Sequence, residues 1–194
     1  MQQATTAKLY AYWNAIRNGR IAPQRFEVDP GRISALLRET FIAEYCGFFA
    51  FKFRLAGTEV CQHFGRELRG LDLLSLWSLE DRRSVFATLE SVVSHGAVGH
   101  GTFIGITNNN REAAFEFVFL PLIHSGTTIN RILGALTPID RPFWIGAEPI
   151  VALELRDIGL LWPDGAAQVS ANGNAQAALE ARKNFRVVQG GLSR

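Results

Sequence analysis

The sequence predicts an α+β protein built on one antiparallel sheet. Two strand patterns come early in the chain, three come late, and helical periodicity precedes and separates the two groups. The late three are joined by short turns, which pair consecutive strands antiparallel. A parallel dinucleotide-binding sheet would instead alternate strand and helix regularly.

The first expected helix spans residues 6–18. Leu9, Trp13 and Ile16 recur at spacings of four and three and form one apolar stripe. Two interpretations stay open: the helix folds back onto its own domain, or it pairs with a second subunit. We take these three residues as the candidate interface of a homodimer.

A second helix is expected after Asp29, which can accept backbone N–H bonds, with Pro30 at the first helical position. The period then becomes that of strands, in "TFIAEY" and "FFAFKFRLAG". The second strand places four apolar side chains on one half-buried face: Phe49, Phe51, Phe53 and Leu55.

A long helix is expected between a capping Ser78 and a terminating Gly96. The three late strands then follow, at about residues 97–107, 112–123 and 129–139. In the middle one, Glu116 lies either on a solvent face or in a paired buried position, and the pattern favours solvent.

At 194 residues the chain is long enough for one domain with additions at its ends. We expect an N-terminal helix and linker, a central domain and a C-terminal extension, at residues 1–22, 23–142 and 143–194. The extension holds a further extended segment, "EPIVALELRDIGLLW", and a short apolar segment, "NFRVVQGG". Between them, residues 163 to about 177 have a composition that predicts low order.

Charge and hydropathy argue against several classes of partner. The net charge of +2 is not the excess that a dedicated nucleic-acid binder carries. No apolar run approaches the roughly 18 residues of a membrane span, and the N-terminus lacks the pattern of a secretory signal. We expect a cytoplasmic protein with no nucleic-acid or membrane partner.

The histidines and cysteines suggest no catalytic or metal site. Cys46 and Cys61 are too few for a metal centre, and the histidines lack metal-ligand spacing. Cys61 precedes His63 by two residues, but buried packing is the favoured role of the thiol. For an enzyme of the isomerase or dehydratase type, His63 with Asp72 is the best pair the sequence offers.

Three segments resemble the PAS family. "GRELRGLDLLSLWSLEDRR" is similar to a PAS segment in which Glu-Leu and Gly precede apolar residues and an acid-capped helix. "FRLAGTEVCQHFGREL" and the N-terminal "LYAYWNAIRNGR" resemble a subgroup of small stand-alone proteobacterial PAS proteins, as does the ending Val187-Val188, Gly190-Gly191. The resemblance covers about residues 8–142 and the tail.

The resemblance implies a PAS fold, in which a five-stranded antiparallel sheet carries a helical layer on one face. In this chain an extra N-terminal helix and the C-terminal extension are added. A ligand cavity, where present, lies between the helices and the sheet. The residues implied to surround it are Phe53, Cys61, Phe64, Leu73, Trp77, Phe86, Phe103, Phe117 and Leu133. The alternative is that these side chains simply fill the core.

Departures from the family's patterns argue against two cofactors. Haem-type PAS proteins place a histidine on a helix near the pocket, and His63 and His95 match this only loosely. Flavin-binding photosensory PAS domains carry their cysteine within Asn-Cys-Arg-Phe-Leu-Gln, a setting that Cys61 in "VCQHFG" lacks. Haem and flavin are therefore not expected, and the cofactor is left unassigned.

The sequence thus predicts a bacterial signalling or regulatory PAS module that catalyses no reaction. Its expected partners are itself, an unidentified regulatory protein, or a small apolar molecule in the PAS cavity. The helix around Trp13 and the sheet face carrying Lys52 and Arg54 are the expected contact surfaces. The alternatives are a metabolite-specific ligand sensor and a small α+β isomerase or dehydratase.

Overall fold

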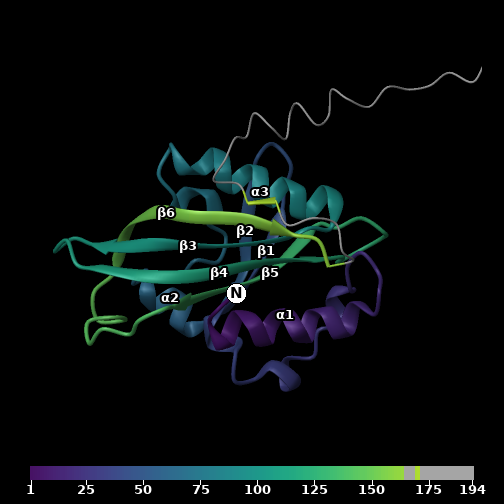
Figure 1. Cartoon of the computed structure of the whole chain (residues 1–194), viewed down its shortest axis with the longest axis horizontal. Helices are drawn as coiled ribbons and strands as arrows, with labels where there is room; N and C mark the ends of the chain where they lie inside the picture. Colours follow the sequence, from purple (N-terminus) through teal and green to yellow (C-terminus); the bar gives the residue numbers. More distant parts are fainter. Residues whose placement is uncertain (164–168, 171–194) are drawn as a thin grey trace, which may run out of the picture.

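An antiparallel sheet of seven strands, in the order β2-β1-β5-β4-β3-β6-β7, forms the centre of the computed structural model, which describes residues 1–163 and 169–170 (Figure 1). The strands are β1 Thr40–Tyr45, β2 Phe51–Ala56, β3 Val98–Thr107, β4 Glu112–Leu122, β5 Arg131–Pro138, β6 Ile150–Leu161 and β7 Val169–Ser170. The α+β class, the antiparallel pairing and the five expected strands are confirmed.

Two further strands lengthen the sheet beyond the predicted five. β6 comes from the extended segment of the C-terminal extension and pairs with β3 from Val98 to Thr107. β7 pairs briefly with β6. Apart from Pro163 and β7, the stretch predicted to be of low order lies outside the described residues, as does "NFRVVQGG".

Helices cover both faces of the sheet, with α1 and α3 on opposite sides (Figure 1). The α-helices are α1 Ala4–Arg17, α2 Thr58–His63 and α3 Asp81–His95. Four short 3-10 helices complete the set: η1 Arg25–Glu27, η2 Pro30–Ile33, η3 Leu37–Glu39 and η4 Leu73–Leu76. The N-terminal and long central helices are therefore where the apolar stripes placed them.

The α-helix expected after Asp29 is replaced by the 3-10 turns η2 and η3. Asp29 does accept a hydrogen bond from the Gly31 N–H at 2.8 Å, as the capping pattern predicted. The chain then continues with i to i+3 bonds, from Leu36 N to Ile33 O and from Glu39 N to Leu36 O. It cannot continue as an α-helix because it must turn within a few residues to enter β1 at Thr40.

The alternation of side chains along the strands divides the interior into two cores. Phe115, Phe117 and Phe119 on β4 face the core shared with α2, η4 and α3. Val118 and Leu120 face the second core, beneath α1. A central strand with apolar residues on both faces is expected where both faces of a sheet are covered.

Glu116 belongs to the α1 side of β4 and is only 4% exposed, so the prediction of a solvent position is wrong. Its carboxylate accepts hydrogen bonds from Gln2 N at 2.6 Å, from Gln3 N at 3.1 Å and from the Thr6 hydroxyl. A negative charge at the start of a helix also suits the helix dipole. Glu116 thus ties the N-terminus of α1 to the middle of the sheet.

Candidate functional site

Aromatic rings fill the space where a PAS cavity would lie. Six of the nine expected lining residues are buried in one core: Phe53, Phe64, Leu73, Trp77, Phe103 and Phe117. The ring centroids of Phe103 and Phe115 are 5.0 Å apart, and those of Trp77 and Phe103 are 5.3 Å apart. The space left among Phe53, Leu73 and Trp77 is about 10 Å³, room for no more than about one water molecule. A separate recess of about 210 Å³ opens at the edge of this core, beside Phe64 and Ile150. These six side chains pack against one another, and their role in lining a ligand cavity stays a prediction.

Of the other three expected lining residues, Phe86 and Cys61 are partly buried against the same core, and Leu133 lies on the opposite face of the sheet. Leu133 faces the α1 side of the sheet, because residues alternate along β5 and Leu133 pairs with Ile42. Phe86 packs at the edge of the core, under the β1–β2 hairpin. Cys61 is half-buried, and burial raises the pKa of its thiol, which keeps the group protonated and poorly nucleophilic at neutral pH.

Two of the three predicted interface residues are buried in the chain's own core. Leu9 and Trp13 are fully buried, and the Trp13 indole N–H donates to the Pro121 carbonyl at 2.8 Å. Ile16 is half-buried beside them. The helix therefore folds back onto its own sheet, and the prediction of Leu9 and Trp13 as direct partner contacts is wrong for this arrangement.

His63 and Asp72, the pair considered for an enzyme, do not share a cavity among those found in the described residues. Asp72 accepts backbone hydrogen bonds from Phe51 and Leu74, at 3.1 and 3.2 Å, and so caps η4. His63 is 2% exposed, and neither ring nitrogen has a hydrogen-bond partner. Within the described part of the chain, no group of three or more His, Cys, Asp or Glu side chains could hold a metal ion.

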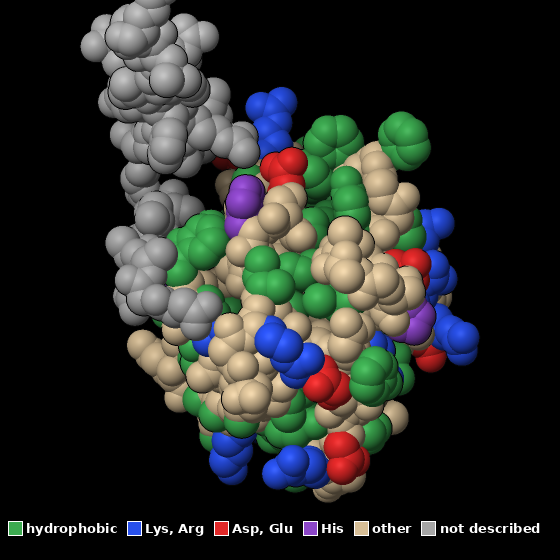
Figure 2. Space-filling model, turned by 90° about the vertical axis from the view of Figure 1, so that its right-hand side faces the viewer, with side chains coloured by type: hydrophobic (Ala, Val, Ile, Leu, Met, Phe, Trp, Pro, Cys, Tyr) green, Lys and Arg blue, Asp and Glu red, His purple; other side chains and the backbone are tan. Residues whose placement is uncertain are grey.

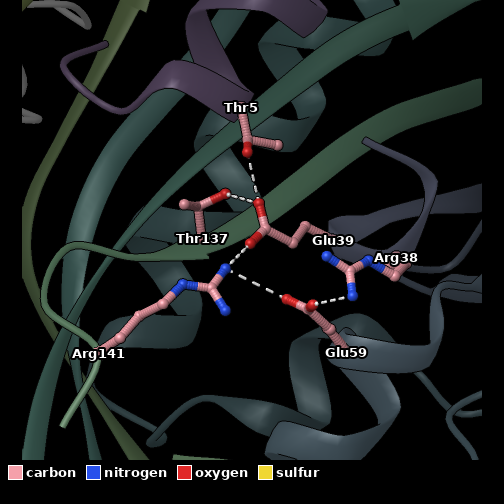
Figure 3. Close-up of polar contacts among 6 residues, drawn as sticks. All are labelled: Thr5, Arg38, Glu39, Glu59, Thr137 and Arg141. Atoms are coloured by element: carbon pink, nitrogen blue, oxygen red, sulfur yellow. Dashed lines mark hydrogen bonds and ion pairs between the residues drawn. The ribbon is translucent and has the colours of Figure 1, made fainter. Parts of the chain in front are cut away.

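A polar cluster joins four parts of the fold around Glu39 (Figure 3). The Glu39 carboxylate accepts hydrogen bonds from the Thr5 and Thr137 hydroxyls and pairs with Arg141. Arg141 also reaches Glu59 on α2 at 3.2 Å. The cluster therefore connects α1, η3, the end of β5 and α2, and explains how a charged residue is tolerated at 8% exposure.

The tip of the β1–β2 hairpin exposes large aromatic side chains. Phe48 is 99% exposed and Phe49 is 68% exposed. Both have positive φ angles, 47° and 63°, which are unfavourable for a bulky residue. Phe49 rests on Phe86, with centroids 4.6 Å apart, while Tyr45 is 38% exposed and packs on Phe51, which also contacts Phe86. We call Tyr45, Phe48, Phe49 and Phe86 the aromatic tip.

The sequence pattern missed the aromatic tip because it extended the inward face of β2 back to Phe49. Gly47, with a φ of 75°, marks the turn that ends this alternation. The dipeptide Cys46-Gly47 was the available signal, since glycine is favoured where φ is positive.

The strand order β2-β1-β5-β4-β3, with α2, η4 and α3 packed over an apolar core on one face of the sheet, is of the PAS type. A family model described as a PAS domain matches residues 1–137. That match covers more than half of the chain, and the chain therefore belongs to the PAS domain family. Domains of this family typically sense or transmit signals.

Among solved structures, the chain is similar to the PAS domain of a protein from Colwellia psychrerythraea, determined by crystallography. The two are 13% identical, the TM-score is 0.42, and the match covers 57% of this chain and 98% of that one. No curated protein matches the chain. Among the helices of the described residues, none has the length and apolar character needed to cross a membrane.

Proposed function

We propose that this chain is a signalling or regulatory module that binds a protein partner through its aromatic tip and catalyses no reaction. The observation that carries this proposal is Phe48, a phenylalanine that is 99% exposed on a backbone with a φ of 47°. Exposing such a side chain in an unfavourable backbone conformation costs free energy, and a partner that buries the ring would offset this cost.

The filled core also supports action through the surface. A PAS domain that senses a ligand between helices and sheet needs space there, and the space among Phe53, Leu73 and Trp77, about 10 Å³, is too little for one. The recess beside Phe64, about 210 Å³, lies at the edge of the core and is below the usual range for small-molecule sites. Domains of this family are usually non-catalytic. The partner is either a second copy of the chain or a separate regulatory protein.

The distribution of charge favours a protein as the partner. Figure 2 shows Lys and Arg side chains scattered around one face, with Asp and Glu among them and hydrophobic groups between. A nucleic acid would instead be recognised by a concentrated basic surface.

The experiment compares Phe48→Ser with Phe26→Ser. Phe26 is a matched control because it is 81% exposed but lies on η1, outside the aromatic tip. Sedimentation of the pure proteins measures self-association, and quantitative crosslinking in cells measures heterologous partners. We expect Phe48→Ser to weaken the complex at least tenfold, with an unchanged melting temperature, and Phe26→Ser to leave it intact. Equal complexes for both variants, or no complex for the wild type, would refute the proposal.

A further inference from the structure

A recess lies on the face of the sheet opposite the aromatic core and has a volume of about 340 Å³. The buried side chains of Ile42 and Leu133 line it from the sheet, and those of Val28 and Ile33 line it from the preceding segment. Leu55 lines it from the edge strand β2. Its volume is within the usual range for small-molecule sites, about 300–1,000 Å³.

A β-bulge in the hairpin places Leu55 at this recess. Ile42 pairs with Leu55 and Ala43 pairs with Phe53, so Arg54 is an extra residue on β2. In a regular strand Phe53 and Leu55 would share a face, whereas the bulge sends Phe53 into the aromatic core and Leu55 to the other side. Leu55 is left 45% exposed at the recess.

The charged side chains that line the recess are both basic. Its lining includes Arg25 and Arg38 and no carboxylate. The Arg38 guanidinium is paired with Glu59 at 3.0 Å. The Arg25 guanidinium has no hydrogen bond or ion pair within the described residues, while its backbone N–H is fixed to the Ile123 carbonyl at 2.6 Å. A cation anchored through its backbone beside an apolar recess favours a ligand with an apolar body and a negative end.

We propose that this recess binds a small amphipathic anion, an aliphatic chain that ends in a carboxylate. The chain would lie against Ile42, Leu133 and Leu55, and the carboxylate would pair with Arg25. This site is on the other face of the sheet from the PAS cavity and is separate from the aromatic tip. The inference therefore goes beyond the proposed function and does not depend on it.

The first test is calorimetric titration of the full chain with hexanoate, octanoate and decanoate. Burial of each added methylene is worth about 0.8 kcal/mol, so the dissociation constant should fall by up to about fourfold per methylene until the recess is full. Decanol is the neutral control. It should bind about two- to fivefold more weakly than decanoate, because it cannot form the ion pair with Arg25.

Three variants assign the binding to this recess. Leu55→Trp adds volume inside it and should abolish decanoate binding. Lys52→Trp is the matched control, because Lys52 is exposed on the same strand and does not line the recess. Arg25→Gln should bind decanol as the wild type does but lose the preference for decanoate.

Several outcomes would overturn the proposal. One is the absence of decanoate binding at about 1 mM, and another is undiminished binding by Leu55→Trp. Equal affinity of the wild type for decanoate and decanol would remove the role of Arg25. A dimer that Leu55→Trp dissociates, with no decanoate bound to the wild type, would mean that a second copy occupies the recess.

Discussion

Lowering the pH should destabilise the protein through His63. Burial lowers the pKa of this histidine to about 4, with the positive charge of Arg141 acting in the same direction and Glu39 in the opposite one. In the unfolded chain the ring should titrate near its ordinary value of about 6.5. The folded state therefore binds fewer protons than the unfolded state, and stability is lost as the pH falls from about 6.5 to about 4.

The size of the effect follows from the difference between the two pKa values. At about pH 7.5 the ring is neutral in both states and contributes almost nothing to the pH dependence. At about pH 4.5 protonation of His63 lowers the free energy of unfolding by about 2.5 kcal/mol, and the limit of this loss at lower pH is about 3.4 kcal/mol. Because His63 is only 2% exposed, solvent screening reduces this figure little.

The assay is urea denaturation of the wild type and of His63→Phe across this pH range. Phenylalanine keeps a ring beside Phe115, whose centroid is 5.2 Å from that of His63, and removes two buried nitrogens that have no partner. The stability advantage of His63→Phe should grow by about 2.5 kcal/mol between about pH 7.5 and 4.5. His124→Phe, which replaces an exposed histidine, should show no such growth.

A constant difference between wild type and His63→Phe across this range would refute the reasoning. Because that variant can also fail for reasons of packing, the ring of His63 is followed directly by NMR in the wild type. A folded-state titration near pH 6.5 would show that the ring is not desolvated as the structure indicates.

Three further changes test the fold by urea denaturation at neutral pH. Gly57→Ala should cost about 3 kcal/mol or more, because its Cβ would lie 2.2 Å from the Leu37 carbonyl oxygen, whereas Gly70→Ala, with open space but a φ of 87°, should cost only about 1 kcal/mol. Glu116→Gln should cost about 1–3 kcal/mol, because a buried carboxylate that accepts three hydrogen bonds becomes an amide with one acceptor oxygen. Phe103→Ala should cost about 3–5 kcal/mol and open an apolar cavity that binds benzene. Equal costs for the two glycine variants would contradict the packing described at Gly57. A Phe103→Ala variant whose stability does not rise with added benzene would contradict the packing described at Phe103.

The sequence was sufficient for features set by local periodicity. The five strands, the α1 stripe and the glycine end of α3 follow from side-chain spacing and turn residues, which act over a few positions. The same local reasoning could not find the partners of Glu116, because they lie 110 or more residues away in the chain. Both faces of β4 are buried, and only the tertiary fold shows that α1 packs on the face that carries Glu116.

The errors in the candidate site have a related origin. Regular alternation puts Phe53 and Leu55 on one face, and a single bulge residue, Arg54, separates them. The family resemblance located the core aromatics but carried no information on how completely they fill the space. It also grouped Leu133 with them, although the alternation along β5 turns this side chain to the other face.

The β1–β2 hairpin connects the two proposed surfaces. The aromatic tip lies at its turn, and Leu55 lies at the far end of β2, close to the start of α2. β2 is the edge strand and pairs with β1 on one side, while on its other side it bonds to the short segment 70–72, through Phe53 N to Leu71 O and Gly70 N to Phe53 O. A ligand that changes how β2 packs in the recess would therefore change the presentation of the tip. Such coupling is reciprocal, so a partner that binds Phe48 must alter the affinity for decanoate by the same factor by which decanoate alters partner binding.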